Sequence, residues 1–425
     1  MKRIVIVGGG FGGISVMKGL AGSGEFRVTL VDRNNYNFFP PLLYQLATGF
    51  LEVANISYPF RKLMRKMRNS RFHMGEVTGV DTQKNLLLLE DGMLPYDVLI
   101  FAVGASTNYF GMENVRAHAM PMKTVNDALE LKNHLLLQME EASKITEISQ
   151  RRKFLNIVVA GGGPTGVEVS GMLADIRHSV FPKDYPEMAA LDSEAGIYLV
   201  DGTDAVLKPM SQRSQQDTLK NLTDMGIKVK LQVQVKDYDG ETVTFSNGET
   251  IVAKTLVWAA GVTCPRFSGM PETAYGRGNR LMVDEYNQVK GLENIYAIGD
   301  CALQQHETLF PNGHPQLAQP AIQQGSNLAA NLKNQESGSK RRPFKYWDKG
   351  SMAIIGRHKA VVDLPGNKTH FRGFIAWFMW LFVHLVSLIN TRNMITTLFN
   401  WTGAYFSKDQ ALRMIIHPET KKKNN

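Results

Sequence analysis

Two glycine-rich loops of the same kind lie far apart in this 425-residue chain. The first is in MKRIVIVGGGFGG at residues 1–13, and the second is in AGGGPTGVEVSG at residues 160–171. Each loop follows an apolar run and precedes a helical pattern, which is the strand, tight turn and helix of a dinucleotide-binding unit. Because each such unit needs its own parallel sheet, the two loops constrain the fold more than any other feature.

The first copy has every part of the dinucleotide-binding pattern. Gly8, Gly10 and Gly13 fit GxGxxG, and the next strand pattern ends in Asp32. The first glycine permits the turn, the second lets the backbone approach a pyrophosphate, and the third lets the helix pack on the strand. The helix N-terminus faces the anion, and the acid bonds a ribose hydroxyl.

The second copy repeats these parts. Gly161, Gly163 and Gly166 follow an apolar run, and the next apolar strand pattern ends in Asp201. An additional segment around FPKDYP, at residues 181–186, lies between them and is interpreted as an insertion.

The repeat extends beyond the loops. LLLLEDGMLPYDVLIFAVGAST at residues 86–107 and VTFSNGETIVAKTLVWAAGVTC at residues 243–264 each predict a hairpin, an apolar strand and a glycine turn. The turns contain Gly104 and Gly261, which lie 96 and 100 residues after the first glycine of their loops. The alternative, glycine loops that merely turn the chain, does not explain this equal spacing.

Two dinucleotide units in one chain indicate electron transfer between two cofactors, with FAD expected in the first unit and NAD(P)H in the second. A further strand pattern ends in Gly299-Asp300, and this turn looks like the second FAD motif of the two-dinucleotide flavoproteins, where the aspartate holds the ribityl chain. We therefore predict an α/β fold with two Rossmann-like domains, the FAD domain being interrupted by the NAD domain, and a C-terminal membrane-associated helical region. The predicted boundaries are 1–115 and 285–340 for the FAD domain, 116–284 for the NADH domain and 341–425 for the C-terminal region.

Four further segments make a family resemblance specific. The chain from residue 1 to about residue 417 resembles the type II NADH:quinone oxidoreductases, the single-subunit respiratory NADH dehydrogenases that do not pump protons. The segments that carry it are PPLLYQLATG at 40–49, FPKDYPEM at 181–188, LAQPAIQQG at 317–325 and YWDKGSMAIIGR at 346–357.

The resemblance implies roles for two of these segments. The Gln–Ala helix of the family lies beside the flavin and lines the quinone pocket, which implicates Ala318, Gln319 and Gln323. An amide can donate to a quinone carbonyl; alternatively, the glutamines are only polar positions of a helix. The family's PLLYQxATG segment lies against the flavin and points to Gln45 and Thr48, for which a proline-started helix is an equal alternative.

Glu168 lies two residues after the last glycine of the second loop. We expect it in the first turn of the following helix, where the helix dipole favours an acid whatever its function. The resemblance implies a second interpretation, because the equivalent glutamate is assigned to nicotinamide positioning and to proton supply. If burial raises its pKa, Glu168 is a plausible proton relay for quinone reduction.

The C-terminal region contains two apolar stretches, at residues 374–389 and 394–406. The first is short for a spanning helix, which needs about 20 residues. Both contain tryptophan, and seven basic residues but only two acidic ones follow position 370. This predicts helices that lie in one leaflet and contact anionic headgroups, with a buried core helix as the alternative.

Few residues indicate metal or disulfide chemistry. Cys264 and Cys301 lie far apart in sequence, and the ten histidines lack the spacing of a metal site, so we predict neither a disulfide framework nor a metal. The formal net charge of +9 is concentrated near the C-terminus, which argues against a nucleic-acid partner.

We therefore predict an enzyme that transfers electrons from NADH through FAD to a membrane quinone without pumping protons, because no other run approaches spanning length. The resemblance implies a peripheral homodimer on the cytoplasmic face of the inner membrane, reducing ubiquinone or menaquinone. One alternative is a sulfide:quinone oxidoreductase, which needs redox cysteines that this chain offers only at Cys264 and Cys301. A non-enzymatic redox sensor that binds FAD and NADH is the other.

Overall fold

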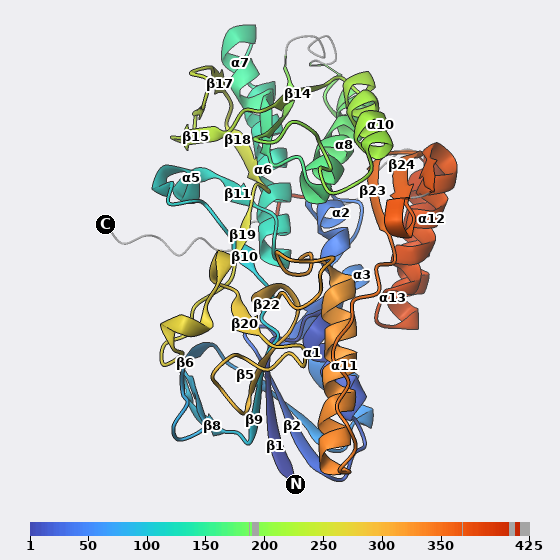
Figure 1. The fold of residues 1–425 in the computed structure, drawn as a ribbon. Coiled ribbons are helices and arrows are strands. Elements are labelled where there is room, and N and C mark those ends of the chain that lie inside the picture. Colours follow the sequence, from blue (N-terminus) through green and yellow to red (C-terminus); the bar gives the residue numbers. More distant parts are fainter. Residues whose placement is uncertain (187, 189–194, 368, 408–412, 417–425) are drawn as a thin grey trace. The chain divides into compact units, whose positions relative to one another are not determined.

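The computed structural model describes residues 1–186, 188, 195–367, 369–407 and 413–416 (Figure 1). The chain forms two compact units, each built from separated segments. The first unit comprises Met1–Phe38, Ser57–Ser106 and Val262–Lys349, and the second comprises Phe39–Ile56, Thr107–Gly261 and Gly350–Asn425. The basic residues Lys408 and Lys421 to Lys423 lie outside the described residues.

The first unit is built on a five-stranded parallel sheet. Its central strands are short apolar runs whose side chains are buried on both faces, as is usual for parallel sheets covered by helices. The strands, in order across the sheet, are β21 (Ile295–Ala297), β9 (Val98–Phe101), β1 (Lys2–Val7), β2 (Phe26–Asp32) and β5 (Ser70–Met74).

Two helices of the first unit, α1 (Phe11–Leu20) and α11 (Ala318–Glu336), lie side by side (Figure 1). They approach closely because small residues face each other. A Cβ atom on Gly325 would lie 2.6 Å from the carbonyl oxygen of Gly12, and one on Gly19 would lie 2.6 Å from the Cβ of Ala329. This contact fixes α11 relative to the first glycine loop.

The remaining elements of the first unit are smaller. The hairpin predicted at Asp91-Gly92 is confirmed, because β7 and β8 pair antiparallel across it. The elements are β3 (Tyr36–Phe38), β4 (Ser57–Pro59), α4 (Phe60–Leu63), β6 (Val77–Asp81), β7 (Leu86–Leu89), β8 (Gly92–Pro95), β20 (Leu281–Val283) and β22 (Ala302–Gln304).

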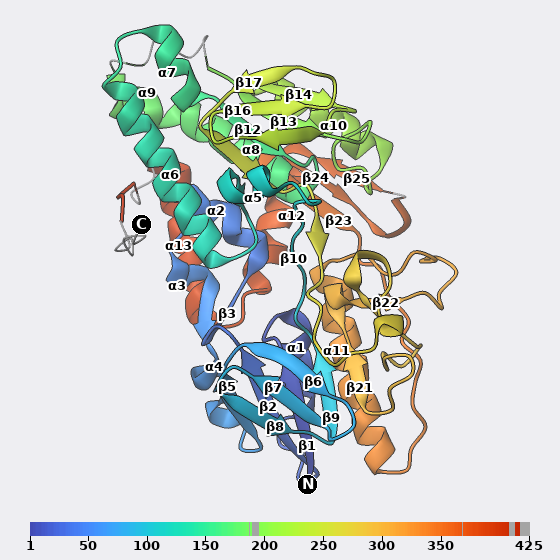
Figure 2. The ribbon, with the colours of Figure 1, turned by 90° about the vertical axis from the view of Figure 1, so that its left-hand side faces the viewer.

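The second unit contains another five-stranded parallel sheet. Neighbouring strands of this sheet are visible in Figure 2. Its first central strand begins at Ile157, and Phe154 and Leu155 of the same apolar run instead end a helix, α7. The strands, in order, are β11 (Met120–Pro121), β18 (Thr255–Trp258), β12 (Ile157–Ala160), β13 (Ile197–Asp201) and β14 (Ile227–Leu231).

Helices and a small antiparallel sheet complete the nucleotide-binding part of the second unit. The long helix α6 begins with a capping box, in which Thr124 and Asp127 satisfy each other's backbone N–H groups. The hairpin predicted at Asn247-Gly248 is confirmed by β16 and β17. The elements are α5 (Glu113–His118), α6 (Val125–Ser143), α7 (Ile148–Leu155), α8 (Pro164–Ser179), α9 (Phe181–Asp184), α10 (Gln212–Asp224), β15 (Val235–Tyr238), β16 (Thr242–Phe245) and β17 (Thr250–Val252).

The second unit also holds the C-terminal region and the segment around PLLYQ. A three-stranded antiparallel sheet, which the sequence did not predict, packs on α8 and carries α12. None of the helices in the described part of the chain is long and apolar enough to cross a bilayer. The elements are α2 (Leu43–Ala47), α3 (Val53–Ile56), β23 (Ser351–Gly356), β24 (Lys359–Asp363), β25 (His370–Arg372), α12 (Gly373–Val386) and α13 (Thr391–Ser407).

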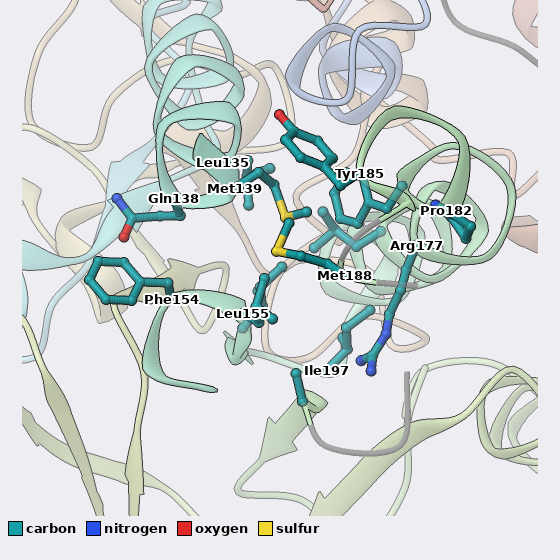
Figure 3. Close-up of a pocket in the computed structure, with 14 residues that line it drawn as sticks. Leu135, Gln138, Met139, Phe154, Leu155, Arg177, Pro182, Tyr185, Met188 and Ile197 are labelled. Carbon is teal, nitrogen blue, oxygen red and sulfur yellow. The ribbon is translucent and has the colours of Figure 1, made fainter. Parts of the chain in front are cut away.

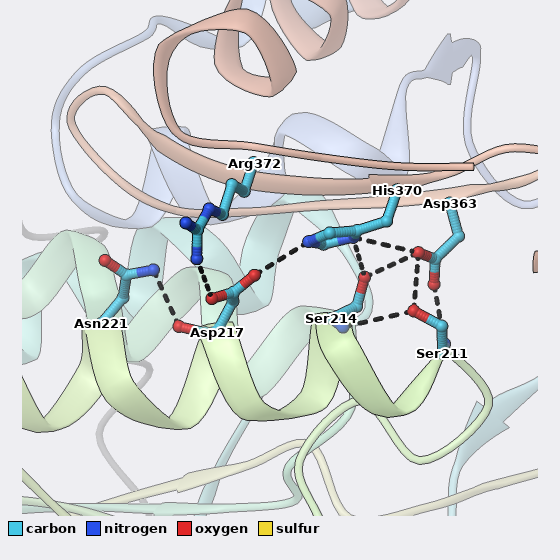
Figure 4. A network of polar contacts seen from close by, with 7 residues as sticks. All are labelled: Ser211, Ser214, Asp217, Asn221, Asp363, His370 and Arg372. Carbon is cyan, nitrogen blue, oxygen red and sulfur yellow. Dashed lines mark hydrogen bonds and ion pairs between the residues drawn. The ribbon is translucent and has the colours of Figure 1, made fainter.

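A buried polar network connects the C-terminal sheet to α10 (Figure 4). Asp363 is 1% exposed and accepts hydrogen bonds from the Ser211 backbone N–H at 2.7 Å and from the Ser214 hydroxyl at 2.8 Å. The His370 ring lies between two carboxylates, with Nε2 2.8 Å from Asp217 and Nδ1 3.3 Å from Asp363. A buried network of this kind stabilises the fold only when each of its polar groups has a hydrogen-bond partner.

The two carboxylates of this network are held in their charged form. Burial alone would raise the pKa of Asp363, but the hydrogen bonds from Ser211, Ser214 and His370 outweigh it, and the pKa is lowered. The pKa of Asp217 is also lowered, because His370 and Arg372 outweigh the effect of its burial.

We expect Asp363→Asn to lower the free energy of unfolding by about 2 kcal/mol at neutral pH, since it removes hydrogen bonds to a charged group. A carboxylate whose pKa is lowered by folding stabilises the protein above its ordinary pKa, and this contribution is lost as the pH falls. The difference between variant and wild type should therefore narrow below about pH 4. Thermal unfolding across pH measures it, with the exposed Asp224→Asn on α10 as control; a pH-independent difference would contradict the prediction.

Candidate active site

The three glycines of the first loop have different environments. Gly8 has a φ of +100°, and a Cβ atom there would overlap the carbonyl oxygen of Ala102. A Cβ atom on Gly13 would overlap the carbonyl oxygen of Gly8. Gly10, the residue before α1, has a φ of −74°, and a Cβ atom on it would meet nothing within 4 Å. The loop thus leaves open space only at the glycine expected beside a pyrophosphate.

Asp32 ends β2 at the edge of this loop. Its carboxylate accepts from the Gly9 N–H at 2.7 Å and from the Asn34 N–H at 2.8 Å, while Asn37 donates to the Gly9 carbonyl at 2.7 Å. Burial raises the pKa of Asp32, and the hydrogen bonds from Asn34 and Gly9 oppose this effect. Loop and acid therefore fit a dinucleotide, with the phosphates at the helix N-terminus and the ribose at the acid.

The second loop reproduces the first in detail. Gly161 has a φ of +110°, and a Cβ atom there would overlap the carbonyl oxygen of Ala259. A Cβ atom on Gly166 would overlap the carbonyl oxygen of Gly161. Gly163 precedes α8 with a φ of −74°, and again its Cβ position meets nothing within 4 Å. Ala102 and Ala259 are the small residues of the repeated glycine turns, so the structure gives the repeat a physical basis.

Asp201 occupies the place in the second copy that Asp32 has in the first. It accepts from the backbone N–H of Gly162, and its other oxygen accepts from the Thr203 N–H at 2.7 Å. The Leu207 N–H donates to the Gly162 carbonyl at 2.8 Å, which ties the following segment to the loop. In the turn that ends this copy, a Cβ atom on Gly261 would lie 2.5 Å from the Phe110 ring.

Two further predicted residues of the first unit lie in turns at the same sheet edge as Gly8. Gly104 follows β9 with a φ of +68°, and Gly299 follows β21 with a φ of +72°. Because β1, β9 and β21 are parallel neighbours, their carboxyl ends meet at one edge. Asp300 is in the 3-10 turn Gly299–Cys301 at that edge. The structure thus brings the predicted FAD residues of the first unit together.

The helix predicted to face the quinone begins at Ala318. Gln319 and Gln323 are one turn apart on it, and both are half-buried. The Gln323 amide pairs with the Trp347 backbone, donating to its carbonyl and accepting from its N–H, each at 3.0 Å. Gln323 therefore holds the segment that leads out of the first unit.

Glu168 lies in the second turn of α8, because the helix begins at Pro164, and the expectation of a first-turn acid is wrong. Its side chain is 9% exposed. Burial raises the pKa of Glu168 to about 8, and the Ile354 backbone N–H and the Trp380 indole beside the carboxyl oppose this only in part. At pH 7 the Glu168 carboxyl is therefore mostly neutral. A helix dipole stabilises only a charged carboxylate, so it does not explain this residue, whereas a protonated carboxyl can serve as a proton donor.

Aromatic residues surround Glu168 within the second unit. Tyr44 and Trp380 contact each other edge-on, with ring centroids 6.2 Å apart, and burial together with the Glu168 charge raises the pKa of Tyr44. His384 stacks on Trp380 with centroids 3.8 Å apart, and burial lowers the pKa of His384 to about 4. No sequence pattern indicated Tyr44, Trp380 or His384 as site residues. Tyr44 is adjacent to the predicted Gln45, but Trp380 and His384 belong to an apolar run without any local signal.

Gln45 and Thr48 are both buried in the second unit. The Trp401 indole donates to the Gln45 side-chain oxygen at 2.7 Å, and the Gln45 amide nitrogen donates to the Tyr44 hydroxyl at 2.9 Å. The Thr48 hydroxyl donates to the Tyr44 carbonyl at 2.7 Å. Both side chains thus hold α2 in place, and Gln45 links it to α13.

The cysteines and the metal-ligating residues form no further site. Cys264 and Cys301 are not joined by a disulfide and are buried in one core cluster of the first unit. Across the described ranges, no group of three or more His, Cys, Asp or Glu side chains could hold a metal ion.

An apolar pocket of the second unit is lined by none of the predicted site residues (Figure 3). The side chains of Met139 and Met188 point toward each other there, and Gln138 and Arg177 provide its polar rim. No glycine of the second loop lines it.

The predicted site residues divide between the units. Those in the first unit are Gly8, Gly10, Gly13, Asp32, Gly104, Gly299, Asp300, Ala318, Gln319 and Gln323. Those in the second unit are Gln45, Thr48, Gly161, Gly163, Gly166, Glu168, Asp201 and Gly261.

Two family models match the chain. The pyridine nucleotide-disulphide oxidoreductase model covers residues 2–325, and the NDH2 C-terminal domain model covers residues 348–408. The first spans both glycine loops, and the second spans the sheet and helices beside Glu168.

Known proteins agree with these matches. Two type II NADH:quinone oxidoreductases of Mycobacterium tuberculosis, Ndh and NdhA, are 34% and 36% identical to the chain, over 95% and 96% of it and 88% and 87% of their own lengths. The structure of NDH2 from Plasmodium falciparum in complex with NADH has the same fold, with a TM-score of 0.88 at 24% identity over 98% of this chain and all of that one. The predicted α/β fold and the predicted resemblance are confirmed. The chain belongs to the type II NADH:quinone oxidoreductases.

Proposed function

We propose that this protein oxidises NADH and passes the electrons through FAD to a membrane quinone. The observation that carries the proposal is the pair of glycine loops, one in each unit, with the same backbone and the same open position at the second glycine. Relatives named for NADH:quinone oxidoreduction match nearly the whole chain. Two dinucleotide sites in one chain serve electron transfer between two cofactors.

The first loop would hold FAD, and the second would hold NADH. A bound FAD supplies the two-electron chemistry between nicotinamide and quinone. The residues that we propose for FAD in the first unit are Gly8, Gly10, Gly13, Asp32, Gly104, Gly299, Asp300 and Ala318, and the family resemblance also implicates Gln45 and Thr48. The NADH residues are Gly161, Gly163, Gly166, Asp201 and Gly261.

Quinone reduction consumes two protons as well as two electrons, so it needs a proton source. Glu168 is buried and is mostly protonated at pH 7, since its pKa is raised to about 8. We assign proton supply or nicotinamide positioning to Glu168. Gln319 would donate a hydrogen bond to a quinone carbonyl, and so would the second amide hydrogen of Gln323, whose first donates to Trp347.

Anaerobic mixing with NADH, followed by a quinone, tests the proposal. NADH should bleach the flavin absorbance, and either ubiquinone or menaquinone should restore it. A sulfide:quinone oxidoreductase would be bleached by sulfide instead, and a redox sensor would be bleached by NADH but not restored by quinone. The solved sulfide:quinone oxidoreductase of Aquifex aeolicus is a more distant neighbour, with a TM-score of 0.71 at 20% identity.

We expect a strong preference for NADH over NADPH. The Asp201 carboxylate would accept from the ribose 2′-hydroxyl and would repel a 2′-phosphate. Because a like-charge contact costs several kcal/mol, kcat/KM for NADH should exceed that for NADPH by about a hundredfold or more. Steady-state rates with both nucleotides measure this, and Asp201→Ala should narrow the ratio. Comparable kcat/KM values for NADH and NADPH in the wild type would contradict this prediction.

A peripheral position on the membrane is supported by α12. One face of this helix is buried through Ala376 and Trp380, yet Ile375, Phe378 and Phe382 on its other face are 62%, 60% and 59% exposed. An apolar face of this kind marks a binding surface, and interfacial helices use it to enter one leaflet. We propose that the protein is a homodimer on the cytoplasmic face of the inner membrane, attracted by anionic lipids.

Replacing Ile375, Phe378 and Phe382 together with serine should move the protein from membranes to the soluble fraction. The substitutions remove exposed apolar area and leave Trp380 in the core, so flavin content should stay normal. Sedimentation with vesicles of anionic phospholipid measures binding, and Ile148→Ser, an exposed apolar residue on α7, is the control. Unchanged sedimentation of the triple variant would rule out this face.

A further inference from the structure

A buried polar chain in the first unit leads from the Gly299–Asp300 turn to the segment around Trp347. Its members are Gln324, which is 1% exposed, His314, which is 2% exposed, and Glu307, whose side chain is 11% exposed. Polar side chains this deeply buried cost free energy unless they are paired.

The chain is continuous. The Gly299 N–H donates to the Gln324 side-chain oxygen at 2.7 Å, and the Gln324 amide nitrogen lies 3.4 Å from His314 Nδ1. His314 Nε2 lies 2.9 Å from a Glu307 carboxylate oxygen. The tautomer that satisfies both contacts is the neutral ring with its proton on Nε2, so that Nε2 donates to Glu307 and Nδ1 accepts from the Gln324 amide. This fixes which way the Gln324 amide points, with its oxygen toward Gly299.

The Gly299 turn depends on this one side chain. Its φ of +72° lies in the left-handed region, and Ala321 of α11 lies 3.0 Å from the position of a Cβ atom on Gly299. The turn is therefore packed tightly on the helix, and Gln324, one turn after Ala321, satisfies its backbone N–H. Losing the acceptor would leave that N–H without a partner in a closely packed place.

The other end of this polar chain of side chains reaches Gln323, which the family resemblance places in the quinone pocket. The Glu307 oxygen that pairs with His314 also accepts from the Tyr346 N–H at 2.8 Å. The next residue, Trp347, is held by Gln323 through two backbone hydrogen bonds of 3.0 Å. Neighbouring glutamines of α11 thus hold the flavin-side turn and the segment 346–347.

We propose that Gln324 is a positioning residue for the flavin, which holds the Gly299–Asp300 turn in its binding conformation with its amide oriented by His314. The inference rests on the proposed function, because it requires FAD at the turn.

Release of FAD from the full-length holoenzyme tests the role. Gln324→Leu removes the acceptor, and FAD should leave about tenfold faster, as expected for an unsatisfied buried donor. On heating, flavin fluorescence should then rise before tryptophan fluorescence reports unfolding. Gln324→Glu keeps an oxygen toward Gly299 but replaces the amide donor to His314 by an acceptor, so it should release FAD at a rate between those of the wild type and Gln324→Leu. The control, Gln335→Leu, makes the same change at an exposed position of α11.

A second variant keeps the test decisive if Gln324→Leu does not fold. His314 lies among the rings of Phe310, Phe344 and Tyr346, so His314→Phe should fit the site while freeing the Gln324 amide. FAD release should accelerate to an intermediate extent. Wild-type release rates in the folded variants, or flavin loss that always coincides with unfolding, would overturn the positioning role. A wild-type protein that binds no FAD would overturn the proposed function itself.

Discussion

Gly163→Ala should strongly slow the reduction of the flavin by NADH while the protein folds normally and keeps its FAD. The backbone at Gly163 has a φ of −74° and a ψ of −177°, which alanine adopts without strain. The added methyl group would meet no protein atom within 4 Å, so it costs nothing in packing. It would instead occupy the space where the pyrophosphate approaches the start of α8.

The expected loss in the rate of NADH-driven bleaching is about a hundredfold or more, because displacing the nicotinamide by an ångström costs this much in a hydride transfer. Stopped-flow absorbance at a fixed NADH concentration measures it. The thermal unfolding temperature should stay within about one degree of the wild type, as for a surface substitution without a structural role.

The corresponding variant of the first loop, Gly10→Ala, should have the opposite effect, since it should weaken FAD binding and leave NADH binding intact. Gly10 has a φ of −74° and the same empty space at its Cβ position, so the first loop should fold but bind FAD poorly. NADH should still bind, which calorimetry on the flavin-free protein can detect. Gly24→Ala, a glycine with open space outside both loops, is the control. If Gly163→Ala and Gly10→Ala had the same effect, the assignment of one nucleotide to each loop would be wrong.

These glycines also show how much of the fold the sequence could predict. GxGxxG, the acid at the next strand end and the hairpins depend on local backbone geometry, and the structure has all of them where the pattern placed them. The strand that precedes the second loop begins at Ile157, three residues later than the start of the apolar run at Phe154, because Phe154 and Leu155 suit a helix end as well as a strand.

The environment of Glu168 could not be predicted in the same way. Its carboxyl lies beside the backbone of Ile354 on β23 and the indole of Trp380 on α12, which are 186 and 212 residues further along the chain. The short strands of the C-terminal sheet gave no alternating pattern, so neither the sheet nor its contact with α8 was expected. A raised pKa is a property of such tertiary contacts, and sequence could supply only the identity of the residue.

Glu168→Gln is the second substitution with a large expected effect. Glutamine keeps the shape of the side chain and removes the proton. A group whose pKa is raised by folding stabilises the protein fully below its ordinary pKa and loses this contribution as the pH rises through its folded value, which is about 8 here. The variant has no such loss, so it should be at least as stable as the wild type at neutral pH and more stable above about pH 8. Its flavin content should be normal, since the residues of the first loop are unchanged.

The two possible roles of Glu168 separate by half-reaction. A proton role spares bleaching by NADH and slows reoxidation by quinone about a hundredfold or more, the usual contribution of a general acid. A positioning role slows bleaching instead. Glu113→Gln, a carboxylate that is exposed on α5, should change neither.

The pH dependence of quinone-driven reoxidation distinguishes a proton role of Glu168 from a positioning role. In the wild type, quinone-driven reoxidation should fall as the pH rises through about 8, because the fraction of protonated Glu168 falls there. In Glu168→Gln the rate should be low and flat across the same range, since nothing at this position titrates. Bleaching by NADH transfers a hydride and no proton from the protein, so it should not follow this titration in either protein. Stopped-flow traces of both halves between about pH 6 and 9 decide the matter, and unchanged rates in the variant would leave Glu168 as a structural residue of α8.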